Sequence, residues 1–421
     1  MATSFTKEER VVFDEVIEGF DAFLSYGALA TKMEPLTPEQ MVHTRDRFWI
    51  PAPMIGASYD GFDQTSNFDG LTELSVPVSI NVHKATPKVL SAKNLRNATA
   101  MRNYAEAAKE QMPAQINISL RNRVALEGSV VVKRLAAPTG YDDLAQANAA
   151  FNRIGVPKPG RVAMIGNDAA IGMTSNLAGR SEATARSDEA YSTGLIARRV
   201  AGFDAYADDV PIRLAAASGG ATTVNGANQF WEPAATTGSG DNTVNLDNRY
   251  SNLTVTAANY ANIKIGDAFT IQGVNSVHLI EKTDTGQLQT FRVVGKPSAG
   301  VIQIAPAIIS NGGSTIGGKE YQNVTATPAN GATITWLNNV TAELNPFFKR
   351  GQLLLLPGSF DVEPDVGWKS LRATTENGIA IQYTRQGEIN DLSVKARWDI
   401  DYGTALLNPQ FAGAMAFNQT P

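Results

Sequence analysis

Residues 91–128 read SAKNLRNATAMRNYAEAAKEQMPAQINISLRNRVALEG, and this stretch decides the fold. Its apolar side chains recur three or four residues apart, the spacing of one face of an α-helix. They are Leu95, Ala98, Met101, Ala105, Ala108, Met112, Ile116, Leu120 and Val124. Gly128 follows them, where a glycine readily ends a helix. The pattern therefore predicts one very long helix. Pro113 removes a backbone hydrogen bond at a cost of about 3 kcal/mol, so we expect a kink or break there.

A shorter acidic helix is predicted before it, from Lys7 to Phe23. Its apolar residues have helical spacing, and acidic residues occupy the other positions. The apolar set is Val12, Val16, Phe20 and Phe23, and the acidic set is Glu8, Asp14, Glu15, Glu18 and Asp21. Pro35 and Pro38 then interrupt regular structure.

A long hairpin is predicted between the two helices. In GASYDGFDQTSNFDGLTELSVPVSINV (56–82), turn-forming residues cluster at the tip, and apolar residues alternate from Leu74 to Val82 on the return strand. A hairpin this long cannot bury both of its faces within its own domain. We therefore expect the hairpin, and the first helix with it, to pack against other copies of the chain.

The rest of the chain divides by composition. Residues 129–211 alternate helix and strand, with a helix over Tyr141–Ile154 and a buried strand RVAMIGN. From Ile212 to about Glu343, short β-runs separated by Gly or Asn turns indicate a small barrel-like insertion. Strands of ordinary core character resume after it, so the insertion interrupts one domain.

Composition excludes several classes of protein. The 421 residues carry 36 basic and 41 acidic side chains, a net charge of −5, with three histidines and no cysteine. Disulfides and thiolate metal sites are excluded, and a histidine metal site is nearly so. No signal peptide and no run of about 18 apolar residues appears, so we expect no membrane segment. The acidic balance argues against specific nucleic-acid recognition.

No catalytic motif is present. Acidic pairs that could serve glycoside hydrolysis occur at Asp142 with Asp143, Asp208 with Asp209, and Asp361 with Glu363. Because adjacent acids on a strand point to opposite faces, and acids in turns are usually solvated, these pairs predict no active site. We expect no enzyme and no cofactor.

The order of these parts resembles the Hong-Kong-type fold of tailed-phage major capsid proteins, and within it the P22-like coat proteins of short-tailed phages. The most specific stretches are EAYSTGLIARRVAGFD (189–204) and VNLDNRY (244–250). The other matching stretches are FDEVIEGF (13–20), FWIP (48–51), DGLTEL (69–74), IGDAFTIQGV (265–274) and GEINDLSVKARWDIDYG (387–403). Together they span nearly the whole chain.

The resemblance implies an α+β fold in six consecutive parts. They are an N-terminal arm (1–45), an E-loop (46–83), the P-domain spine helix (84–128), the first half of the A-domain (129–211), an inserted β-barrel domain (212–343) and the second half of the A-domain and P-domain (344–421). It implies a structural coat protein whose hexamers and pentamers form the icosahedral shell around the double-stranded DNA of a tailed bacteriophage.

The resemblance also implies partners. Because the arm begins close to Met1, we expect a separate scaffolding protein. A portal protein and packaged DNA, held by non-specific contact only, complete the virion, which assembles in the bacterial host cytoplasm. The E-loop has no lysine between Pro51 and His83, so an isopeptide bond from this loop is excluded and the shell must be held non-covalently.

Two sets of residues are candidate contact sites. Asp14, Glu15 and Glu18 lie where a basic scaffolding helix could dock, although a solvated helix face explains them equally well. Asp241, Asn242, Asp247 and Arg249 match the loop of the insertion that reaches the next capsomer.

Two other functions remain open. One is a carbohydrate-binding or glycan-hydrolysing virion protein, suggested by the Thr- and Asn-rich insertion and its acids. The other is a bacterial encapsulating shell of the same fold, disfavoured by the large insertion.

Overall fold

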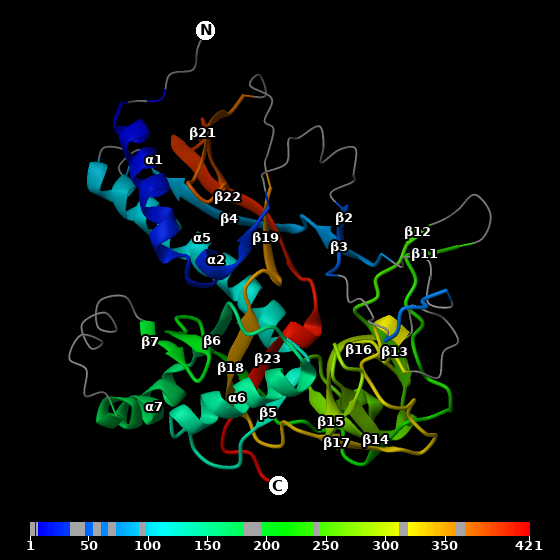
Figure 1. Cartoon of the computed structure of the whole chain (residues 1–421). Helices are drawn as coiled ribbons and strands as arrows, with labels where there is room; N and C mark the ends of the chain where they lie inside the picture. The colour runs from blue at the N-terminus through cyan, green and yellow to red at the C-terminus, as the bar shows by residue number, and fades with distance from the viewer. Residues whose placement is uncertain are drawn as a thin grey trace. The chain divides into compact units, whose positions relative to one another are not determined.

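The computed structural model describes residues 5, 7–33, 47–53, 60–65, 73–91, 94, 97–180, 195–238, 244–310, 319–358 and 367–421 (Figure 1). The chain forms two compact units. The first contains Met1–Phe48, Val78–Arg121 and Leu353–Ala405, and the second contains Trp49–Pro77, Asn122–Gln352 and Leu406–Pro421. Helices and strands occur in both units, in agreement with the α+β prediction.

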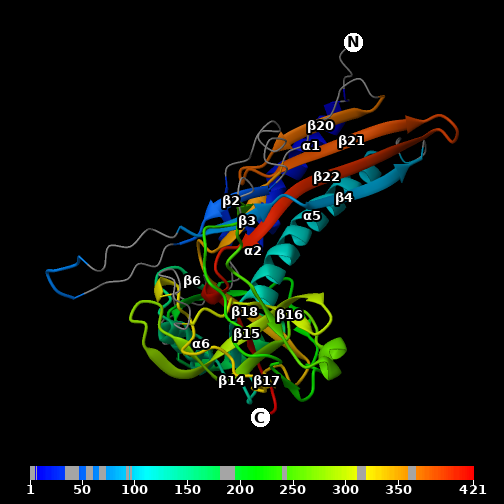
Figure 2. The same cartoon turned by 90° about the vertical axis from the view of Figure 1, so that its right-hand side faces the viewer.

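A six-stranded sheet organises the first unit. Its order is β1-β19-β22-β21-β20, with β4 also paired to β22. The strands are β1 (Thr31–Lys32), β4 (Val82–Leu90), β19 (Leu353–Pro357), β20 (Lys369–Thr374), β21 (Ala380–Glu388) and β22 (Ser393–Leu406). In Figure 2, β20, β21, β22 and β4 lie side by side as a long ribbon. Residues 84–90 of the predicted spine-helix part (84–128) form a strand, and the helix itself begins at Ala98.

The first helix, α1 (Lys7–Phe20), packs on this sheet. Phe13, Val16 and Phe20 are 5%, 2% and 0% exposed, and the Phe13 ring stacks on Trp398 at 5.7 Å between centroids. The prediction that this helix needs another copy to bury its apolar face is therefore wrong. Phe23 is 44% exposed, because α1 ends at Phe20 and a 3-10 turn, η1 (Asp21–Phe23), changes the period of the face.

The spine helix α5 (Ala98–Glu127) is continuous over 30 residues with Pro113 inside it, so of the predicted kink or break the break is wrong and the kink stays a prediction. Met112 and Ile116 on either side of the proline are 1% and 0% exposed. Their burial offsets the lost hydrogen bond. Asn117 fastens the arm to this helix. Its side-chain Nδ2 donates to the Phe23 carbonyl at 2.8 Å, and its Oδ1 accepts from the backbone N–H of Gly27, in α2 (Ser25–Leu29), at 3.3 Å.

In the second unit, the A-domain is built on a seven-stranded sheet. Its order is β5-β23-β18-β6-β8-β7, with β9 also paired to β18. The strands are β5 (Val130–Lys133), β6 (Arg161–Ile165), β7 (Leu195–Val200), β8 (Phe203–Ala207), β9 (Ile212–Leu214), β18 (Ala342–Lys349) and β23 (Ala412–Ala416). The helices are α6 (Tyr141–Ile154), with the predicted bounds, α7 (Asn167–Arg180) and the short η3 (Pro409–Phe411). Phe151, Phe203 and Phe347 meet in the core.

The insertion forms a second six-stranded sheet, in the order β10-β17-β14-β15-β16-β13. The strands are β10 (Thr222–Thr223), β13 (Ser251–Thr254), β14 (Ala268–Val277), β15 (Asp284–Ser298), β16 (Val301–Ala305) and β17 (Thr333–Trp336), accompanied by η2 (Ala257–Asn262) and the small pair β11 (Thr236–Thr237) and β12 (Val244–Asn245). A bridge between Val224 and Val255 joins the two edges, so the sheet closes on itself. Ile212–Leu214 and Ala342–Glu343, which we had placed in the insertion, belong to the A-domain sheet.

Buried hydrogen bonds join the insertion to the residues after the spine helix. Arg292, in β15, is fully buried and donates to the carbonyls of Gly128 at 3.2 Å and Gly266 at 2.7 Å. The Thr290 hydroxyl donates to the Ser129 carbonyl at 2.6 Å. The insertion is therefore fastened to the end of α5.

Candidate assembly surfaces

A groove of about 350 Å³ lies between α1 and α5 in the first unit. It is lined by Val12, Glu15, Val16, Glu18 and Gly19 from α1 and by Arg102, Ala105, Glu106 and Lys109 from α5. The end of the Lys109 side chain lies over Gly19, where a Cβ would require this flexible side chain to move. The buried face of α1 fixes the helix, so the groove has a defined shape.

The three predicted docking carboxylates all lie on the solvent side of α1. Asp14, Glu15 and Glu18 are exposed, and Glu15 and Glu18 line the groove while Asp14 does not. The groove also holds cations: Arg102 lies 4.0 Å from Glu15, a distance at which an exposed pair contributes little. The structure thus brings the predicted acids together beside basic groups of the same chain.

In the predicted intercapsomer loop, Asp247 and Arg249 pair with each other. Arg249 Nε and Nη2 donate to the two Asp247 oxygens at 3.0 and 2.8 Å, and its Nη1 donates to the Leu406 carbonyl at 2.8 Å. Burial lowers the pKa of Arg249, but the bond to Asp247 together with the charges of Asp247, Tyr250 and Glu127 leaves the pKa raised. Each nitrogen of the guanidinium therefore donates a hydrogen bond within the chain. Asp241 and Asn242 lie outside the described residues.

The base of the E-loop packs on its own chain, which corrects part of our expectation for the hairpin. Its strands, β2 (Arg47–Pro51) and β3 (Ser75–Ser79), pair with each other. Beyond them, Leu74 is 6% exposed and joins Ala307, Ile309 and Tyr321 of the insertion in an apolar cluster. Residues 54–59 and 66–72, most of the rest of the loop, lie outside the described part of the chain.

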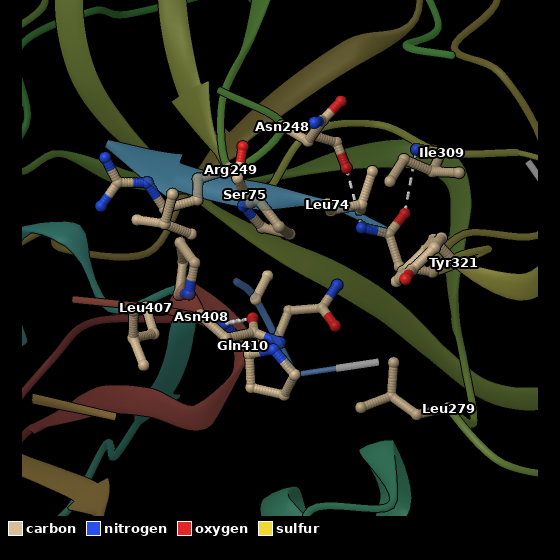
Figure 3. A pocket seen from close by; sticks show the side chains of 17 residues that line it. Leu74, Ser75, Asn248, Arg249, Leu279, Ile309, Tyr321, Leu407, Asn408 and Gln410 are labelled. Atoms are coloured by element: carbon tan, nitrogen blue, oxygen red, sulfur yellow. Dashed lines mark hydrogen bonds between the residues drawn. The ribbon is translucent and has the colours of Figure 1, made fainter. Parts of the chain in front are cut away.

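A cavity of about 80 Å³ adjoins this cluster (Figure 3). The Asn323 side chain shapes it, accepting from the Ile309 amide at 3.0 Å and donating to the Ala307 carbonyl at 2.7 Å. Figure 3 shows Leu74, Tyr321 and Leu407 approaching it from different parts of the chain. The only local sequence signal that Leu74 would be buried was the alternation of apolar residues that begins there.

In each described pair that suggested glycan hydrolysis, one acid is buried with a structural partner, while the other, Asp142 or Asp209, is exposed. Asp143 is fully buried, accepts from the amides of Thr139 and Gly140, and pairs with Arg134 at 2.7 Å. Asp208 accepts from the Val210 amide at 3.0 Å, and Asp361 and Glu363 lie outside the described residues. In the described segments, no group of three His, Asp or Glu side chains could hold a metal ion.

The described helices include none that is long and apolar enough to cross a bilayer. With these surfaces in view, comparison with known proteins defines the class as a phage coat protein. The family model of the P22 coat protein (gene protein 5) matches residues 1–417, so the chain belongs to this family.

Solved structures of phage capsids are also similar. The CUS-3 coat protein I-domain has 38% sequence identity, covering 28% of this chain and 96% of that chain, with a TM-score of 0.21. The capsid of Ralstonia phage GP4 has 9% identity, covering 99% of this chain and 92% of that chain, with a TM-score of 0.43. The head of Helicobacter pylori bacteriophage KHP40 has 9% identity, covering 100% and 93%, with a TM-score of 0.41.

The chain is a phage major capsid protein with a structural, non-enzymatic role, and it self-associates into a multimeric shell. Membership of the coat protein family favours this role over the two alternatives, a glycan-hydrolysing virion protein and a bacterial encapsulating shell.

Proposed function

We propose that the chain builds the icosahedral shell of a tailed phage from hexamers and pentamers, assembled in the host cytoplasm around a separate scaffolding protein. The shell also holds a portal protein and encloses double-stranded DNA by non-specific contact. The single observation that carries the scaffolding step is the exposed acidic side of α1, formed by Asp14, Glu15 and Glu18 on a helix whose opposite face is buried.

Because α1 is held in place, its carboxylates are suited to bind a helix of the scaffolding protein. Because Phe13, Val16 and Phe20 hold α1 to the sheet, a partner would lose little further entropy on ordering this surface. A basic helix would gain attraction to Asp14 and Glu18, which no ion pair engages among the described residues. The scaffolding protein must leave later, and contacts at an exposed rim are weak enough for that.

The test is the double variant Asp14→Lys with Glu18→Lys. We expect the free subunit to keep its thermal stability and binding to scaffolding protein to weaken about tenfold, because both changes reverse exposed charges. Binding would be measured on the subunit, and particle yield by electron microscopy of assembly reactions.

The matched control is Glu232→Lys with Glu281→Lys, which makes the same charge change at exposed positions of the insertion that do not line the groove. Equal binding by the double variant and the wild type would refute docking on α1. An equal loss in the control would show an effect of net charge alone.

The loop ending at Asp247 stays our candidate for contact between capsomers. Since Arg249 is already bonded within the chain, we propose that it acts by fixing the loop and that the neighbour meets another residue of the loop, with Asp241 as the candidate. Arg249→Ala should therefore loosen the loop and lower particle stability more than Asp247→Asn does.

A further inference from the structure

The Tyr250 side chain connects the insertion to the end of the spine helix. Its hydroxyl donates to Oε2 of Glu127, the last residue of α5, at 3.0 Å. Burial, followed by the charge of Glu127, raises the pKa of Tyr250, so the hydroxyl stays protonated and remains a donor. The Arg249 guanidinium lies over the Tyr250 ring, 4.9 Å from its centroid. We call Glu127, Arg249 and Tyr250 the Tyr250 junction.

The same segment of the insertion holds the return strand of the E-loop. The backbone of Asp247 forms a parallel bridge with Ser75, in β3, and Arg249 lines the same cavity as Ser75 (Figure 3). Beside them, Leu74 packs in the apolar cluster with Ala307, whose amide donates to the Arg249 carbonyl at 3.1 Å. These residues all belong to the second compact unit. A continuous set of contacts therefore runs from the end of α5, through the junction, to the E-loop.

Neither the spine helix nor the core of the insertion explains the contact between Tyr250 and Glu127. The helix dipole disfavours a carboxylate at the C-terminus of a helix, and the pair of Arg123 with Glu127 has the less favourable order along the helix. Tyr250 is absent from the apolar core that the described residues of the insertion form. The contact therefore indicates a role between the two elements.

This contact gives the insertion a second point of attachment. Arg292 and Thr290, both in β15, already fasten the insertion to the residues that follow α5. Tyr250 precedes β13, which β16 separates from β15 in the sheet. A body held at one strand can still rotate about it, whereas a contact beside another strand fixes its orientation. The Tyr250 junction thus fixes the insertion, and with it the base of the E-loop.

We propose that Tyr250 and Glu127 are positioning residues that set the direction in which the E-loop leaves its own subunit. This inference rests on the proposed function, since the E-loop would reach a second copy of the chain in the shell. The two residues act through Asp247 and Ser75 and require no contact with the neighbour. They preorganise the E-loop, so less entropy is lost when subunits associate.

Tyr250→Phe tests this role, because it removes the hydroxyl and keeps the ring under Arg249. In the free subunit, the backbone amides of residues 73–77 should exchange hydrogen about tenfold faster, while those of β14 in the barrel keep the wild-type rate. The subunit concentration needed for assembly should rise about tenfold, because the E-loop is less well ordered. Hydrogen exchange with mass spectrometry and light scattering measure the two effects. Tyr260→Phe, whose ring packs on the barrel core, is the matched control and should change neither.

Substitutions of Glu127 separate the hydrogen bond from the charge. Glu127→Gln keeps an oxygen that can accept from Tyr250, so exchange and assembly should stay at the wild-type level. Glu127→Ala removes the acceptor and should match Tyr250→Phe. Because both residues act through one contact, the double variant Tyr250→Phe with Glu127→Ala should be no worse than either single variant.

Wild-type exchange at residues 73–77 in Tyr250→Phe would overturn the proposal, and so would wild-type assembly of that variant. Equally faster exchange in β14 would assign Tyr250 to the stability of the insertion instead. Additive losses in the double variant would show that the two residues act separately. Exchange is measured on the free subunit and does not depend on assembly, so failure of the wild-type chain to assemble would count against the proposed function alone.

Discussion

Among single residues, Arg292 is a charged side chain that is fully buried, where desolvation disfavours its charged form. Burial lowers its pKa to about 10, and the charge of Asp267 offsets part of the shift. The guanidinium donates to the buried carbonyls of Gly128 and Gly266, so its removal would take a donor from each of them. Gly128 follows the end of α5, where a cation also complements the helix dipole. One side chain thus couples the insertion to the spine helix.

Lys282 allows a prediction about pH. It lies in the turn between β14 and β15, and burial lowers its pKa to about 8, with Glu320 opposing the shift. In the unfolded chain its pKa is about 10.4. Between these values the unfolded state binds more protons, so stability should rise as the pH increases from about 8 to 10.5. Thermal melts of the free subunit would measure this rise.

Lys282→Met is the variant that isolates this effect. It removes the partly buried charge, so the subunit should melt higher at pH 7 and show a smaller rise between pH 8 and pH 10.5. Lys264→Met, at an exposed position of the same unit whose backbone amide donates to Asp267, is the comparison. An unchanged pH profile in Lys282→Met would contradict the assignment.

At this scale, sequence reasoning is limited by contacts that are distant along the chain. In LQTFRVVG, Phe291 and Val293 point into the barrel, so Arg292 between them would be expected to face solvent. It is buried because residues 128–131 cover that side of β15. Nothing near Arg292 in the sequence signals this cover. The exposure of the acids on α1 could be predicted, because it follows from the helical spacing of α1 alone and depends on no distant segment.

Among the elements, the insertion gives a prediction about autonomy. Its sheet closes on itself around its own apolar core, so the 212–343 fragment should fold cooperatively alone. Arg292→Met should destabilise the whole chain more than this fragment, by about 1 to 3 kcal/mol, because only the whole chain contains the Gly128 carbonyl. Chemical denaturation of both proteins measures the difference.

The control for this comparison is Thr285→Val, a change within the insertion whose hydroxyl bonds to the Ser276 carbonyl at 3.1 Å. It should cost the same in the fragment and the whole chain. A fragment without a cooperative transition would contradict the closed barrel as an independent unit. Equal costs of Arg292→Met in both proteins would remove the proposed coupling.

Elements with strong periodicity were predictable, whereas their pairing was not. The spine helix and α6 follow from apolar spacing, since side chains three or four apart must share a face. The break at Pro113 was predicted from propensity alone, which tertiary burial of Met112 and Ile116 overrides. Strand order, such as β4 beside β22, joins residues more than 300 positions apart and leaves no local trace.

For the whole molecule, the lysine-free E-loop predicts a shell held by non-covalent contacts. Intact particles heated in denaturing detergent should give one band near the 45.0 kDa of a single chain. Gel electrophoresis of purified particles measures this directly. A ladder of covalent multimers would contradict the prediction and would require a lysine outside residues 52–82.

The order of the parts along the chain was predictable from composition and resemblance, while the partners of two parts were not. We expected both α1 and the hairpin to depend on other copies. The structure instead seats α1 on its own sheet and the hairpin base on the insertion. A single sequence cannot tell whether an apolar face meets its own chain or another, because both burials remove the same surface from water.

The two ends of the insertion meet within one sheet, with Leu214 directly opposite Ala342. A protein engineer could exploit this adjacency, since any foreign module whose termini lie about 5 Å apart could replace residues 215–341 without stretching the strands that carry it. Vaccine antigens or enzymes grafted at this position would be displayed once per subunit. The graft would lose the Arg292 fastening to Gly128, so a linker restrained by proline would serve better than a glycine-rich one.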